Sequence, residues 1–130
     1  MKPCKIKLLG EGYVFRQNNP AIVGVEIMAG TITSNMPLMT TEGVEVTSVK
    51  GIRLETENIE SATRGARVSA SLTGITIGRQ IQKDSTLYSN IPEAHFRKYK
   101  EFKDYLRDDE KELLKEIALI MRVKNPVWGI

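Results

Sequence analysis

The chain has 130 residues, of which 41% are hydrophobic and 27% charged, values typical of a water-soluble globular domain. Its net charge of +3 reflects 19 basic against 16 acidic residues, so a nucleic-acid partner is permitted but not demanded. The absence of an apolar run of membrane-spanning length and of a signal-peptide core predicts a cytoplasmic protein without membrane contact. The single cysteine, Cys4, excludes an internal disulfide and a thiolate-rich zinc site and is expected to be a semi-exposed structural thiol.

The first 90 residues predict a domain that is mainly β. Short runs rich in β-branched residues alternate with Asn, Pro and Gly turns, and they lie at residues 6–9, 13–16, 22–27, 30–32, 37–39, 44–54, 66–72 and 86–89. Many short strands at this spacing favour a closed β-barrel, which also removes exposed strand edges.

Two glycines interrupt the stretch of residues 21–32, which we expect to organise the barrel. Gly24 lies within a β-branched run, where a glycine marks a bulge, a barrel corner or a close approach of a ligand to the backbone. The barrel corner is favoured over a ligand-facing gap. Gly30 is expected to supply a tight reversal before residues 31–32 begin a return strand.

Two helices are predicted after a break in composition at residues 89–90, which divides the chain into a barrel at residues 1–90 and a helical hairpin with a tail at residues 91–130. The first helix opens at residue 90 or 91 with Pro92 in its first turn. Its apolar positions recur at helical spacing at Phe96, Tyr99, Phe102 and Leu106. A capping-box-like pair, Asp109 and Glu112, opens the second helix, and residues 125–126 stop it.

Catalytic motifs are not found in the sequence. His95 is the only histidine and has no recognisable nucleophile or carboxylate motif around it, so it is interpreted as a surface or packing residue. The Gly10-Glu11-Gly12 segment lacks the strand-to-helix context of a phosphate loop. We therefore expect no enzyme activity, cofactor or metal in this chain by itself.

Several segments resemble the last domain of the universal translation initiation GTPase that joins ribosomal subunits. They are residues 12–17 (GYVFRQ), 20–30 (PAIVGVEIMAG), 37–39 (PLM), 78–81 (GRQI) and 87–88 (LY). The archaeal and eukaryotic branch, initiation factor five-B, is the more similar because it adds two C-terminal helices. The ending at residues 125–130, NPVWGI, is similar to the archaeal form in particular.

This resemblance implies a barrel like domain II of translational elongation-factor GTPases, followed by a two-helix appendage. It also implies that GTP and magnesium belong to a catalytic domain elsewhere in the full-length protein. The implied partners of this monomeric domain are the methionyl acceptor end of initiator tRNA, the ribosome and, through the helices, the tail of initiation factor one-A.

The resemblance also implies site residues on the barrel. Positions that bind the formyl-methionine end in bacterial relatives match Arg53, Arg67, Val68 and Ser69, with Gly24 and Val25 on the strand opposite. Leu54 and Glu55 depart from the bacterial pattern, so a weaker and less group-specific contact is expected. The arginines suit phosphates or pair with surface glutamates, and the Gly24 gap beside Val25 and Val68 is expected to form a shallow pocket for methionine.

On the helices, the basic and aromatic residues that suit a short acidic and hydrophobic peptide are Lys98, Tyr99, Lys100, Lys103 and Tyr105. Two other functions remain open. A free-standing RNA-binding or ribosome-associated barrel requires a contiguous basic face. A small-ligand or enzymatic barrel requires a polar constellation in a deep cavity.

Overall fold

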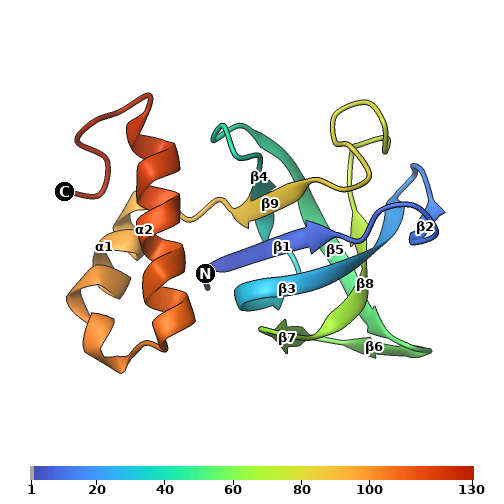
Figure 1. Ribbon diagram of the computed structural model, residues 1–130, viewed down its shortest axis with the longest axis horizontal. Coiled ribbons are helices and arrows are strands. Elements are labelled where there is room, and N and C mark those ends of the chain that lie inside the picture. The colour runs from blue at the N-terminus through green and yellow to red at the C-terminus, as the bar shows by residue number, and fades with distance from the viewer. Residues whose placement is uncertain (1) are drawn as a thin grey trace.

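Strand β3 (Ala21–Thr33) is the longest element of a β-barrel that stands beside a pair of helices (Figure 1). The computed structural model describes residues 2–130. The other strands are β1 (Cys4–Leu8), β2 (Val14–Arg16), β4 (Pro37–Met39), β5 (Glu45–Leu54), β6 (Glu57–Ile59), β7 (Ser61–Thr63), β8 (Arg67–Leu72) and β9 (Thr86–Ser89). The helices are α1 (Glu93–Glu101), a 3₁₀ turn (Lys103–Tyr105) and α2 (Asp108–Arg122).

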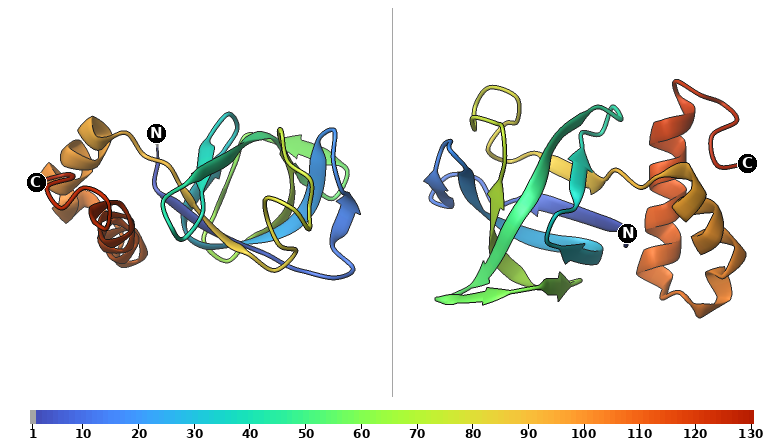
Figure 2. Two further views of the ribbon diagram at one scale, coloured as in Figure 1. Left: turned by 90° about the horizontal axis from the view of Figure 1, so that it is seen from above. Right: turned by 180° about the vertical axis from the view of Figure 1, so that it is seen from behind.

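The strand pairings close on themselves. The hydrogen-bonded order runs β1-β9-β4-β5-β8-β3, and β3 pairs again with β1, which gives a closed antiparallel barrel of six strands. Figure 2 shows this ring of strands with the helices at one side of it. The predicted fold class, a closed barrel followed by a two-helix appendage, is confirmed. The short strands β6 and β7 were not predicted from the sequence.

The barrel interior is filled by alternate residues of neighbouring strands. On β3 and β8 the register pairs Val25 with Val68, Val23 with Ala70, and Ala21 with Leu72, and all six side chains are buried. Because strand side chains alternate between faces, the residues between them point outward. Burying an aliphatic side chain of this kind stabilises the fold by about 1.5–3 kcal/mol, so this interior layer contributes strongly to folding.

Gly30 does not reverse the chain, so the predicted break between residues 22–27 and 30–32 is wrong. Its φ of +76° is the permissive backbone that was expected, but β3 continues through it. At this point β3 leaves β8 and pairs with β7, with Thr31 opposite Thr63. A Cβ at Gly30 would overlap the carbonyl oxygen of Pro3, so this glycine serves a bend and a close backbone approach.

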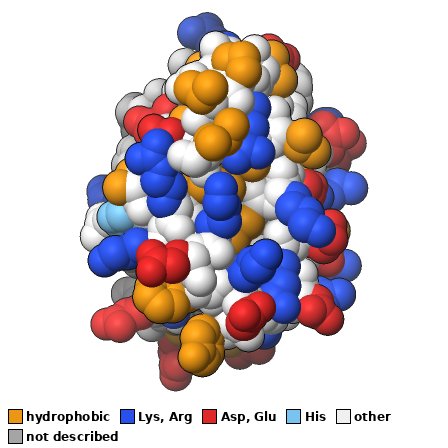
Figure 3. Space-filling model, turned by 90° about the vertical axis from the view of Figure 1, so that its left-hand side faces the viewer, with side chains coloured by type: hydrophobic (Ala, Val, Ile, Leu, Met, Phe, Trp, Pro, Cys, Tyr) orange, Lys and Arg blue, Asp and Glu red, His pale blue; other side chains and the backbone are white. Residues whose placement is uncertain are grey.

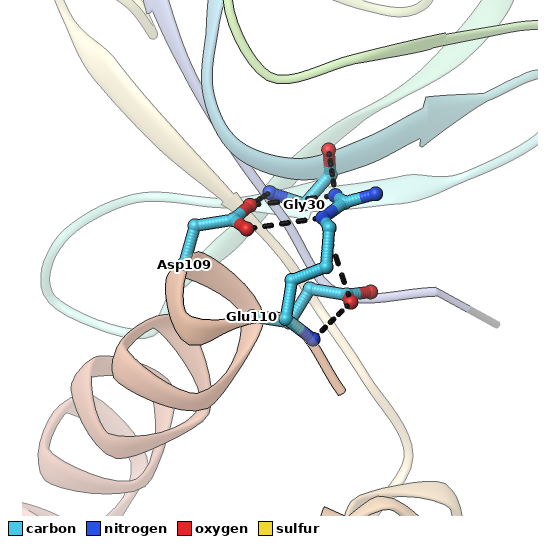
Figure 4. Close-up of polar contacts among 4 residues, drawn as sticks. Gly30, Asp109 and Glu110 are labelled. Atoms are coloured by element: carbon cyan, nitrogen blue, oxygen red, sulfur yellow. Dashed lines mark hydrogen bonds and ion pairs between the residues drawn. The ribbon is translucent and has the colours of Figure 1, made fainter. Parts of the chain in front are cut away.

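The start of α2 also differs from the prediction. The helix begins at Asp108, and the N–H of Arg107 donates to Glu110 Oε1 at 3.0 Å, so the capping pair lies two residues before the expected Asp109 and Glu112. Asp109 has a tertiary role instead: its Oδ2 accepts the N–H of Gly30 at 2.9 Å (Figure 4). Arg107 Nε donates to Asp109 Oδ1 at 3.0 Å, and the Arg107 guanidinium and the Gly30 N–H hold the pKa of Asp109 below its usual value.

Further contacts fix the helices to the barrel. Lys5 Nζ and the Tyr88 hydroxyl both donate to Glu116 Oε1 of α2 at 2.9 Å. The hydrogen bond to Glu116 raises the pKa of Lys5. A second apolar cluster joins Met39 and Tyr88 of the barrel to residues of both helices, among them Phe96 and Leu113. The hairpin therefore shares a core with the barrel, although the sequence places it after a break in composition.

The C-terminal residues fold back onto the helices. Trp128 packs on Phe96 with ring centroids 4.6 Å apart, and its carbonyl accepts Arg122 Nε at 2.7 Å. The Gly129 N–H donates to Glu93 Oε2 at 2.6 Å. At the other end of the chain, Cys4 is fully buried rather than semi-exposed, and burial raises the pKa of its thiol.

Candidate binding sites on the barrel and the helices

The structure brings most of the predicted barrel residues together. Gly24 of β3 lies opposite Ser69 of β8, and Ser69 lies opposite Arg53 of β5. These three positions form one row across the outer surface of the barrel. Arg67 lies further along β8, opposite Glu26. These residues are far apart in the sequence and become neighbours only through the register of the strands.

Val25 and Val68 do not belong to the outer surface. They face each other across β3 and β8 inside the barrel, and their exposed fractions are 0% and 6%. Their side chains complete the core, so the expected shallow methionine pocket beside Gly24 is not formed by them. The alternation of strand side chains places Gly24 and Ser69 outward and these two valines inward.

The space above Gly24 is occupied by Tyr13. A Cβ built at Gly24 would lie 3.0 Å from Cδ1 and 3.1 Å from Cβ of Tyr13, so the ring rests on the glycine. The register of β3 with β8 runs through Gly24 without a bulge. Gly24 therefore leaves no open gap for a ligand, since an aromatic side chain lies against it.

The two arginines of this surface differ in their contacts. Arg67 Nε forms an ion pair with Glu26 Oε1 at 3.0 Å, and Arg53 donates to the carbonyl oxygen of Thr56 at 3.1 Å. Both arginines are exposed, and exposed ion pairs contribute little to stability. The Arg53 guanidinium is held by a neutral acceptor and keeps its full positive charge toward solvent.

A groove of about 720 Å³ lies between α1 and α2. Its floor is apolar, and its rim carries cationic side chains from both helices and from the turn between them. The apolar lining residues are Phe96, Leu114, Ala118 and the exposed Leu119, and the charged lining residues are Lys100, Lys103, Lys111, Lys115, Arg122 and one carboxylate, Asp104. Figure 3 shows Lys and Arg side chains gathered on this side of the molecule, with hydrophobic side chains among and above them.

The peptide-binding residues predicted from the sequence are divided between two hollows. Lys100 and Lys103 line the groove between the helices. Lys98, Tyr99 and Tyr105 line a separate hollow of about 420 Å³ with His95, Phe102 and Leu106. The basic residues of α2 were missed, although Lys111, Lys115 and Arg122 recur at helical spacing and mark one face of that helix.

Residues 2–130 contain neither a cluster of metal-ligating side chains nor a membrane-spanning helix. No group of three or more His, Cys, Asp or Glu side chains is arranged to hold a metal ion. In the same described range, every helix is too short or too polar to cross a membrane.

The amino-acid sequence of the chain is similar to those of known proteins with this kind of domain. The family model "Elongation factor Tu domain 4" matches residues 2–88. Over the whole chain the sequence is 43% identical to the probable translation initiation factor IF-2 of Methanopyrus kandleri, and over 98% of it 42% identical to that of Metallosphaera sedula. The chain spans 22% of the length of each of these relatives.

The solved structures give the same result. The crystal structure of GDP-bound aIF5B from Aeropyrum pernix is similar over 99% of this chain and 22% of that one, with 39% identity and a TM-score of 0.92. This match includes both helices, which the family model does not reach. The resemblance predicted from the sequence is therefore confirmed, and the chain belongs to the elongation factor Tu domain 4 family, in the form with two helices that archaeal initiation factors of the IF-2 and aIF5B type contain.

Proposed function

We propose that this domain is a non-catalytic, ligand-holding part of a larger translation initiation GTPase that joins ribosomal subunits. The barrel contacts the methionyl acceptor end of initiator tRNA, and the helices receive the acidic and hydrophobic tail of initiation factor one-A. GTP and magnesium act at another domain of the full-length protein, and the site of action is the ribosome in the cytoplasm. The archaeal initiation factors to which the chain is similar support this role.

The observation that carries the proposal is the groove between α1 and α2. A peptide with alternating acidic and branched apolar residues has the two properties that this groove complements, since its apolar side chains meet the floor and its carboxylates meet the basic rim. Five cationic residues against one carboxylate, Asp104, disfavour a basic peptide by charge repulsion.

Binding of a labelled peptide that carries acidic and apolar residues tests the groove. Lys115→Glu should weaken this binding about tenfold or more, because it replaces an attractive charge on the rim by a repulsive one. Lys7→Glu, at an exposed position on the barrel, is the matched control and should leave binding unchanged. Lys98→Glu reports on the second hollow. Loss of binding with Lys98→Glu but not with Lys115→Glu would place the peptide in the second hollow and refute the groove.

The barrel surface is proposed to contact RNA through Arg53, Arg67 and Ser69, because Gly24 is buried beneath Tyr13. Arg53→Ala should weaken binding of both methionyl and uncharged initiator tRNA, and it should reduce the dependence of affinity on salt by about one unit of slope, because one phosphate contact is lost. Since Val25 and Val68 are buried, preference for the methionyl form should be small. Equal affinity of the wild type and the variant at all salt concentrations would contradict the assignment of Arg53.

The alternative function is a free-standing RNA-binding or ribosome-associated barrel. The reading frame that precedes the segment distinguishes the two, because a GTPase domain encoded in frame is required by the first proposal and is incompatible with the second.

A further inference from the structure

Two exposed aromatic side chains lie on the outer face of the barrel, beside the row formed by Gly24, Ser69 and Arg53. Phe15 lies in β2, and Tyr13 immediately precedes this strand. Tyr13 is 44% exposed and Phe15 is 61% exposed. Large aromatic side chains on a soluble surface are costly to expose and mark contact sites. In Figure 1, β2 lies at the end of the barrel away from the helices, so this surface is separate from the helical groove.

The backbone fixes both rings. The Gly24 N–H donates to the carbonyl of Tyr13 at 2.7 Å, and Val14 pairs with Val23. The β2 register then shifts between Val14 and Arg16, so Phe15 lies in a bulge, a device that redirects a side chain. Because a Cβ at Gly24 would lie only 3.0 Å from Tyr13 Cδ1, glycine is what allows this side chain to lie so close to the strand.

A second row of outward positions follows that of Gly24. In it, Ile22 of β3 pairs with Ser71 of β8, and Ser71 pairs with Gly51 of β5, so two of its three side chains are small. A hollow of about 580 Å³, which the two rings do not line, adjoins this row and is lined by Ser71, Gly51, the exposed Lys50 and Glu60, among others. Arg53 ends the first row on the same strand as Lys50. We call the surface formed by Tyr13, Phe15, Gly24, Ser69 and Ser71 the aromatic trough.

We propose that the aromatic trough is a stacking platform for an unpaired nucleobase at the 3′ end of an RNA, with the adjoining phosphates directed toward Arg53 and Lys50. This inference rests on the proposed function and extends it, since it assigns recognition of the RNA end to Tyr13 and Phe15. The combination of aromatic faces with neighbouring cationic side chains is what single-stranded nucleic acid requires. A second copy of the chain is disfavoured as the occupant, because its own Arg53 and Lys50 would lie against the same two positive charges and be repelled by them.

Stacking and phosphate contact predict different variant behaviour. Loss of one stacked base weakens binding about 5- to 150-fold and leaves the salt dependence unchanged, because no ion is released from the phosphates. Tyr13→Leu and Phe15→Leu should show this pattern, while Tyr13→Phe should restore wild-type affinity because it keeps the ring. Arg53→Gln should flatten the salt dependence instead. Phe102→Leu removes a similarly exposed ring from the helical end and should change neither the affinity nor its salt dependence.

The test uses a short single-stranded RNA whose 3′-terminal base is 2-aminopurine, whose fluorescence decreases on stacking, titrated with the complete chain. Quenching in the wild type and in Tyr13→Phe, with loss in Tyr13→Leu and unchanged melting temperature, supports the trough. Quenching and affinity that survive both leucine variants, with binding still lost in Arg53→Gln, would overturn the trough but leave the proposed function. No binding of this RNA or of tRNA by the wild type would overturn both. A change in sedimentation mass in the leucine variants would assign the rings to self-association and refute the RNA site.

Discussion

The carboxylate of Asp109 is expected to decide how firmly the helical hairpin is held to the barrel. Its side chain is 9% exposed, and it accepts hydrogen bonds from the Gly30 N–H at 2.9 Å and from Arg107 Nε at 3.0 Å (Figure 4). Asp109→Ala leaves the Gly30 N–H without this acceptor between β3 and α2. A hydrogen bond to a charged group contributes about 1.5–3 kcal/mol, so we expect the free energy of unfolding to fall by about 2 kcal/mol.

For a chain of this length, a loss of 2 kcal/mol corresponds to a decrease of roughly 8 °C in the melting temperature. Urea unfolding followed by circular dichroism measures the change directly. Asp108→Ala is the matched control, because it removes a neighbouring acidic side chain from the same first helical turn but is exposed. It should cost less than half as much as Asp109→Ala.

The pH dependence gives a second measure of the same interaction. Since the folded-state pKa of Asp109 lies below its ordinary value, its stabilising effect is complete above that ordinary value and is lost as pH falls through the folded-state pKa. The difference between the wild type and Asp109→Ala should therefore decrease between pH 6 and pH 2.5. Equal effects of the two alanine variants, or a difference that does not change with pH, would refute the role assigned to Asp109.

Three further predictions concern the termini and the bend in β3. Gly30→Ala should lower the free energy of unfolding by about 3 kcal/mol or more, because φ is positive there and the new Cβ overlaps the backbone before β1. Gly12 has a similar φ but open space around it, so Gly12→Ala should cost only about 1–2 kcal/mol in urea unfolding. Trp128→Ala should lower the free energy of unfolding by about 3 kcal/mol because a buried ring is lost, and Val127→Ala, 65% exposed, should be nearly neutral in the same assay. Cys4 should react with a thiol reagent much more slowly in the native chain than in urea, because burial raises its pKa and blocks access, and equal rates would contradict its placement.

The order and kind of most elements were available from the sequence, although β6 and β7 were not and β3 was divided in two. Strands at residues 37–39 and 86–89 were predicted residue for residue, and the number and spacing of short β-branched runs indicated a barrel. These signals are local: β-branched alternation, glycine and proline turns, and helical spacing act over a few residues. The resemblance to the initiation factor domain rested on short segments that were also local.

Contacts between residues far apart in the chain determined the bend in β3 and the role of Asp109. Gly30 has the positive φ that its sequence context predicted, but only its contact with the backbone before β1 and the change of partner from β8 to β7 distinguish a bend from a reversal. Asp109 looks like a capping residue along the chain, and tertiary contact with Gly30 gives it another partner.

The candidate sites divide in the same way. The resemblance assigned Arg53, Ser69 and Gly24 to one site, but only the barrel register shows that they form one row and that Val25 and Val68 face inward. On the helices, the spacing of the basic residues of α2 was present in the sequence, whereas the groove exists because α1 packs beside that face. Residue type and periodicity are encoded locally, while the facing of side chains across strands and helices depends on contacts between residues far apart in the chain, and for this reason only the tertiary structure determined it.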